Sequence, residues 1–87
     1  MKNKVLVKLI VVELSETYDV FIPVNEVIWK IKKLFLKSIS DLSNLSLLGK
    51  NECILINKET SRIYNDNEII INTDIRNGTE LVLKIQE

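Results

Sequence analysis

The chain has 87 residues, of which 46% are hydrophobic and 28% are charged, and its 12 basic residues balance its 12 acidic residues. This composition is typical of a globular protein and excludes a disordered or membrane-spanning chain. We expect one small domain, 1-87, whose zero net charge gives no general attraction to nucleic acid.

The residue types needed for catalysis are scarce. The chain has no His, so the usual general base and the commonest metal ligand are missing. Cys53 is the only cysteine, so it can form no internal disulfide and has no His to activate it, and we expect a structural role. Gly49 and Gly78 cannot form a phosphate-binding loop. We therefore expect that the protein is not an enzyme and has no cofactor and no metal site. Because a single cysteine implies no disulfide scaffold, we expect a cytoplasmic location.

Two strands are predicted first. Residues 5–12 are rich in β-branched residues, and Lys8 makes their apolar run too short to insert in a membrane. One face of this strand is expected to point to the core (Val5, Val7, Leu9 and Val11). The opposite face is more apolar than solvation requires (Leu6, Lys8, Ile10 and Val12). After a loop over 13–17, a second strand is expected over 18–22, with Val20 and Ile22 inward.

A helix is predicted over 25–38. Apolar residues recur there at the helical period (Val27, Ile28, Ile31, Leu34 and Phe35). Asn25 is the expected N-cap, and Glu26 and Lys30 are spaced as an i,i+4 ion pair. Residues 39–50 are expected to form a loop whose leucines cover an edge of the core (Leu42, Leu45, Leu47 and Leu48).

The second half of the chain contains the remaining strands. We expect a strand over 53–57, a turn over 57–60 and a short strand over 62–65. Residues 68–76 are ambiguous, because Asn77-Gly78 is a hairpin signal while Asn72, Thr73 and Asp74 interrupt the apolar run. We favour a short helical turn there. The last strand is expected over 80–85, with its apolar residues inward (Leu81, Leu83 and Ile85).

This order predicts an α+β protein with the β-grasp (ubiquitin-like) fold. The sheet would be mixed and four- to five-stranded, with the first and last strands as parallel neighbours and one main helix across one face.

The residues also resemble a known family. Three segments are similar to the motifs of the YukD/EsaB ubiquitin-like family. They are Asp19-Val20-Phe21-Ile22-Pro23 followed by Ile28 and Ile31, then Ile56-Asn57-Lys58-Glu59, and finally Ile70 with residues 75–81. The resemblance covers 4–85. Asp74 departs from it, because the family usually has Gly there, so any left-handed backbone would be carried by Asp74.

The resemblance implies a cytoplasmic accessory protein of the WXG100, or type VII-like, secretion systems of Gram-positive bacteria, which acts by binding secretion-machine components. The alternative is a β-grasp adaptor or regulator unconnected with secretion. Because the sequence ends Leu83-Lys84-Ile85-Gln86-Glu87, without the Gly-Gly of conjugated ubiquitin-like proteins, we expect it not to be conjugated.

Two surfaces are candidates for protein binding. On the helix, Trp29 and Leu36 are expected to lie away from the buried stripe, beside Lys30, Lys33 and Lys37. Such a patch would anchor a protein partner or an anionic surface. The alternative is a solvated basic face, with Trp29 lying over the helix or over the leucine-rich loop. On the sheet, the outer face is expected to carry exposed apolar residues (Leu6, Ile10, Val82 and Leu55). This face would bind a partner, pair with a second copy in a homodimer, or lie under the 39–50 loop. We expect no nucleic acid partner and no membrane insertion.

Overall fold

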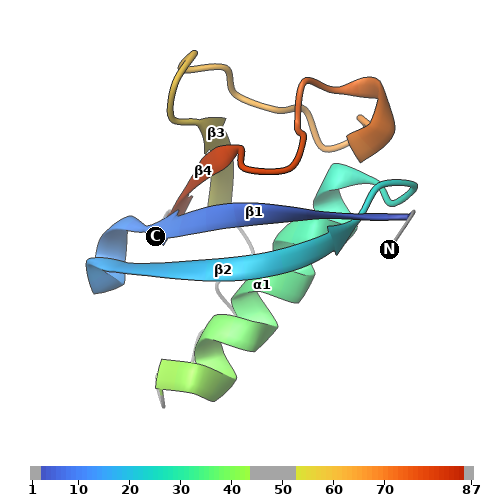
Figure 1. Cartoon of the computed structure of the whole chain (residues 1–87). Helices are drawn as coiled ribbons and strands as arrows, with labels where there is room; N and C mark the ends of the chain where they lie inside the picture. The colour runs from blue at the N-terminus through green and yellow to red at the C-terminus, as the bar shows by residue number, and fades with distance from the viewer. Residues whose placement is uncertain (1–2, 44–52, 86–87) are drawn as a thin grey trace.

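The computed structural model describes residues 3–43 and 53–85. Their four strands form one mixed sheet in the order β2-β1-β4-β3. The strands are β1 (Lys4–Val11), β2 (Glu16–Pro23), β3 (Cys53–Asn57) and β4 (Glu80–Ile85). β1 and β4 are parallel, whereas β2 and β3 pair antiparallel to β1 and β4. The helix α1 (Ile28–Ser43) crosses one face of this sheet (Figure 1). The predicted β-grasp fold is therefore confirmed.

The core lies between the sheet and α1. Alternate residues of each strand point into it, as the period of a strand requires, and the register places Leu9 of β1 opposite Leu81 of β4. The buried sheet residues come from the predicted inward faces of β1, β2 and β4 and from β3 (Val7, Leu9, Val11, Ile22, Cys53, Leu55, Leu81, Leu83 and Ile85). Val5 and Val20, also predicted to point inward, are half-buried and pack against this core. The predicted inward faces of the terminal strands are confirmed.

The start of α1 differs from the prediction. The helix begins at Ile28, so Asn25 is not its N-cap, and the prediction of that cap is wrong. The amides of Ile28 and Trp29 instead donate to the carbonyls of Glu68 and Asp66, at 2.8 and 3.2 Å. The segment before β4 thus satisfies the unpaired first-turn amides that a capping side chain would otherwise bind.

The end and the phase of α1 also differ. The helix continues to Ser43, so residues 39–43 are helical and not loop, while Leu45, Leu47 and Leu48 lie outside the described residues. Ile39 is buried and belongs to the apolar stripe. With Ile39 included, the centre of the buried stripe lies further towards Leu36 and away from Leu34. Leu36 is accordingly 8% exposed, and Leu34 is 43% exposed. The assignment of Leu34 to the core and of Leu36 to the surface is wrong.

The segment between β3 and β4 contains the predicted helical turn, the 3-10 helix η2 (Ile70–Asn72). The strand expected over 62–65 is reduced to one bridge between Ile63 and Ile56. Gly78, at φ +88°, has the left-handed backbone of the turn before β4, and a Cβ there would meet nothing within 4 Å. Asp74 is not among the residues with positive φ, so it does not carry the left-handed backbone considered for it.

A buried polar network holds this segment to the sheet. The side chain of Asn57 accepts hydrogen bonds from the amides of Glu59 and Thr60, at 2.9 and 3.3 Å, and donates to the hydroxyl of Tyr64 at 3.2 Å. Tyr64 is buried and donates in turn to Asp74. Because buried polar groups are costly unless they are paired, this network fixes the turn after β3 and the loop before β4 together.

Candidate protein-interaction surfaces

An apolar row crosses the outer face of the sheet. The register aligns Ile10 of β1 with Val82 of β4 and Val82 with Ile56 of β3. All three are half-buried. The bridge from Ile56 to Ile63 extends the row at the β3 edge, where Ile63 is 56% exposed. Side chains paired across neighbouring strands share a face, so these four form one continuous patch, here called the apolar row.

A second apolar group lies on the same face. Leu6 of β1 is paired with Phe21 of β2, and they are 37% and 52% exposed. The amide of Leu6 donates to the side chain of Asn77 at 2.8 Å, and its carbonyl accepts from Gly78 at 2.8 Å. The turn before β4 therefore fixes this part of β1.

Charged residues separate the two apolar groups. Lys8 of β1 stands opposite Asp19 of β2 and opposite Glu80 of β4, and Glu80 is paired with Lys58 at 3.2 Å. The outer face is therefore two apolar areas divided by a line of mixed charge. Such a surface combines apolar contact area with polar groups that orient a protein partner.

Leu55 is absent from this face. It is fully buried, so the assignment of Leu55 to the outer face is wrong. Its neighbours Ile54 and Ile56 point outward instead, and the sequence analysis missed Ile56, Ile63 and Phe21. The register of β3 against the final strand would have found Ile56, because it lies directly opposite the predicted surface residue Val82.

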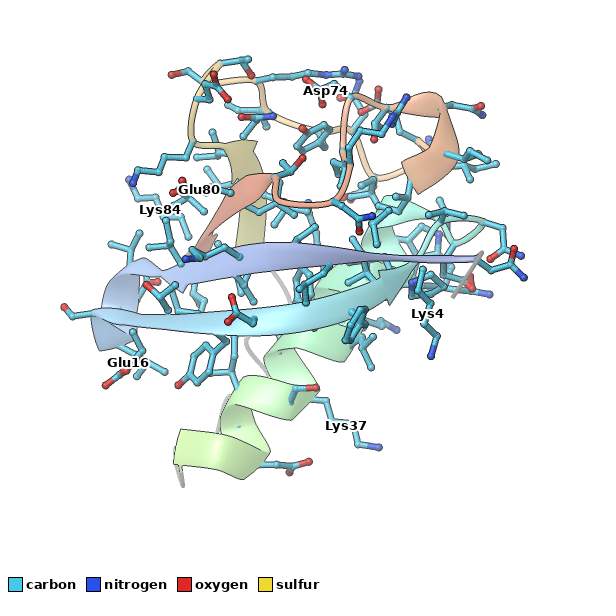
Figure 2. The ribbon with its side chains drawn as sticks, viewed as in Figure 1. Lys4, Glu16, Lys37, Asp74, Glu80 and Lys84 are labelled. Atoms are coloured by element: carbon cyan, nitrogen blue, oxygen red, sulfur yellow. The ribbon has the colours of Figure 1, made fainter. Side chains whose placement is uncertain are left out.

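The second candidate surface is the exposed side of α1. Trp29 is 40% exposed, and the amines of Lys30 and Lys33 lie 5.6 and 5.3 Å from the centre of its ring. Lys37 points from the helix into solvent (Figure 2). Leu36 does not join this surface, because it is buried under the helix.

The predicted binding residues therefore do not form one site. Leu6, Ile10 and Val82 lie on the outer face of the sheet, and Trp29 and Lys33 lie on α1, which covers the inner face (Figure 1). The sheet and the core separate the two surfaces.

Several ionisable residues of the segment between β3 and β4 interact with one another. Arg62 pairs with Glu68 and Asp74 and lies 5.0 Å from the ring centre of Tyr64. Burial and the hydrogen bond to Asp74 raise the pKa of Tyr64 to about 12, so its phenol stays protonated. Burial likewise raises the pKa of the Cys53 thiol. Within 3–43 and 53–85, no three His, Cys, Asp or Glu side chains are grouped as metal ligands would be.

Comparisons with known proteins identify the fold. No protein-family model and no curated protein sequence matches the chain. Solved structures of ubiquitin-like proteins do. The ubiquitin-like domain of Dsk2 from Plasmodium falciparum matches with a TM-score of 0.69 and 16% identity, over 95% of this chain and 99% of that one. Ubiquitin from Caldiarchaeum subterraneum matches with a TM-score of 0.67 and 14% identity, over 97% and 95%.

A chain of the ESX-5 inner membrane complex, in its MycP5-free state, matches with a TM-score of 0.78 and 14% identity. The match covers 97% of this chain but 21% of that one, so this chain corresponds to about a fifth of that protein's length. At such identities the likeness shows the ubiquitin-like fold alone. In the described part of this chain, no helix has the length and hydrophobicity to cross a membrane.

Proposed function

We propose that this ubiquitin-like chain acts, as a single non-catalytic cytoplasmic domain, by binding another protein through the outer face of its sheet. The partner that we propose is a component of a type VII-like secretion machine of a Gram-positive bacterium. The observation that carries the proposal is the apolar row, flanked by Leu6 and Phe21 on the same face.

The composition of this face supports protein binding. Phe21 and Ile63 are more than half exposed, although burying an apolar side chain of this size is worth about 2 kcal/mol. Exposed apolar area interleaved with charges is typical of surfaces that other proteins cover. Among 3–43 and 53–85, neither an activated nucleophile nor a metal-ligand cluster competes as an explanation.

Two findings support the secretion link. The motifs over 4–85 resemble those of YukD/EsaB proteins, and a chain of the ESX-5 inner membrane complex contains a stretch with this fold. The ESX-5 likeness is an example of this fold within an inner membrane complex, and we propose that this chain joins a comparable assembly by binding one of its components.

Photo-crosslinking in the cells that make the protein tests the proposal. A photoreactive amino acid at Phe21 or Ile63 is expected to crosslink to a secretion-machine component, whereas the same residue at the exposed Asn67 is not. Phe21→Ser and Ile63→Ser are expected to weaken capture of that component about tenfold and to reduce secretion, with the melting temperature unchanged. Crosslinks only to a second copy would identify a homodimer instead.

The alternative is a β-grasp adaptor unconnected with secretion. It is favoured if the Phe21 crosslink leads to a protein outside any secretion machine and secretion continues in the two variants. Neighbouring genes for a WXG100 substrate and an FtsK-type ATPase would favour the secretion role.

A further inference from the structure

The exposed side of α1 carries a line of lysines. Lys30, Lys33 and Lys37 are spaced i, i+3 and i+7, so they lie on one side of the helix along about 10 Å of its axis. Trp29 flanks this line on one side and Leu34 on the other, and both are about two-fifths exposed. We call these five residues the basic helix face.

The lysines at the centre of this face have no acidic partner. Lys30 pairs with Glu26 at 3.5 Å, and Asp41 is exposed one turn beyond Lys37. Within the described residues, neither Lys33 nor Lys37 lies within 4.0 Å of a carboxylate. Lys32, by contrast, is turned towards the core and bonded to Asp66 at 2.6 Å. The two acidic residues therefore mark the ends of the face, and its middle is cationic.

Trp29 adds an aromatic surface to this charge. Two ammonium groups lie within 6 Å of the centre of its ring, which attracts cations through its π-electrons. The two ammonium groups repel each other, so a carboxylate placed between them would be attracted to both. Because Trp29 is 40% exposed, its indole also offers apolar contact area to a partner.

The shape and number of these charges favour one class of partner. Recognition of an anionic membrane generally takes a cluster of about four to eight basic residues, more than this face has. Nucleic acid binding needs several phosphate contacts and draws little help from a chain of zero net charge. A helix with carboxylates three, four and seven residues apart would reach all three lysines together, because it repeats their own spacing.

We propose that the basic helix face docks an acidic amphipathic helix of another protein, with carboxylates against Lys30, Lys33 and Lys37 and an apolar side chain against Trp29. This site is separate from the outer sheet face, so it depends neither on the secretion role nor on the partner of that face. With both surfaces occupied, the chain would hold two proteins on opposite sides of its sheet.

Trp29 provides a direct readout, because it is the only tryptophan of the chain. The probe is a synthetic helical peptide with glutamates at the matching positions and one leucine beside them, and the control peptide has glutamine in place of each glutamate. The glutamate peptide is expected to shift the emission of Trp29 to shorter wavelength in a saturable way and to bind about tenfold more tightly than the glutamine peptide at low salt. Equal affinities, or no saturable shift, would contradict the proposal.

Charge variants locate the contact. Lys33→Glu with Lys37→Glu is expected to weaken binding of the glutamate peptide at least about tenfold. Lys84→Glu, an exposed lysine of β4, is expected to change it less than about twofold. Lys33, Lys37 and Lys84 are all exposed, so the variants and the wild type should have similar melting temperatures. Lys33→Gln with Lys37→Gln serves as a milder second variant. Binding that survives both double substitutions would overturn the assignment.

The native partner is identified with a photoreactive residue at Leu34. The crosslinked segment is expected to be acidic and helical, with carboxylates at the spacing given above. Crosslinking to lipid, together with a Trp29 emission shift on phosphatidylserine vesicles but not on the peptide, would make this face a membrane contact and refute helix docking.

Discussion

The hydroxyl of Tyr64 donates a hydrogen bond to the carboxylate of Asp74, and this bond joins the segment that follows β3 to the loop that precedes β4. Asp74 also pairs with Arg62, whose guanidinium lies beside the Tyr64 ring. The family that the sequence resembles usually has Gly at this position. The structure gives Asp74 a side-chain role that Gly could not fill.

This bond predicts a pH dependence of stability. Burial and Asp74 raise the pKa of Tyr64 from 10.0 to about 12 in the folded protein, so at high pH the unfolded chain loses the proton first. The stabilisation is complete below about pH 10 and is lost as the pH rises towards 12, by up to about 3 kcal/mol. Urea denaturation over this range should show that the free energy of unfolding falls more steeply for the wild type than for Tyr64→Phe. Equal slopes would contradict this prediction.

The phase of α1 gives a matched pair of substitutions. Leu36→Ala removes a buried side chain and is expected to lower the free energy of unfolding by about 2 to 4 kcal/mol. Leu34→Ala changes an exposed leucine two residues away and should lower it by less than about 1 kcal/mol. Chemical denaturation measures both. A larger loss for Leu34→Ala than for Leu36→Ala would contradict the observed helix phase and support the one expected from the sequence.

Glu13 is expected to stabilise the end of β4. Both of its carboxylate oxygens lie 3.2 Å from the amide of Ile85, so Glu13→Ala removes the acceptor of that amide. The loss is expected to be about 1 kcal/mol, with faster hydrogen exchange at Ile85. The control is Glu16→Ala, an exposed glutamate at the start of β2, which should change neither. Unchanged exchange in Glu13→Ala would show that the bond contributes nothing.

Cys53 should be unreactive in the folded protein. Its thiol is buried, and burial raises the pKa above 9.0, so little thiolate forms near neutral pH. Alkylation by iodoacetamide is expected to be at least about a hundredfold slower in buffer than in denaturant, because it requires opening of the structure. Similar rates in the two conditions would show that Cys53 is accessible.

Most of the fold could be predicted because the strands alternate clearly. Apolar residues at every second position define the inward faces of β1 and β4, and the interruption after Ile71 identified η2. The helix was predicted, but its bounds and its buried face differ from the prediction. Ser and Asp after Ile39 resemble a loop in composition, although tertiary contacts of the helix outweigh their weak helix propensity. Because the predicted stripe did not include Ile39, it was centred on the wrong side of the helix. Leu34 was therefore assigned to the core and Leu36 to the surface.

The candidate surfaces were predicted only in part. Every residue from Cys53 to Ile56 is apolar, so alternation alone cannot tell which face of β3 is buried, and Leu55 was assigned to the wrong one. Pairing with β4 decides the matter. Trp29 and Lys33 were placed correctly on an exposed surface because both lie far around the helix from Ile31 under either phase.

The parallel pairing of β1 with β4 joins residues as distant as Lys8 and Glu80. On the ribosome, β1, β2 and α1 therefore leave the exit tunnel well before the strand that lies between β1 and β3. Until β4 emerges, the β1–β2 hairpin is not joined to β3, because β4 lies between β1 and β3 in the sheet. Such distant contacts slow folding, and the apolar sides of β1, β2 and α1 lack their full cover until β4 pairs with β1.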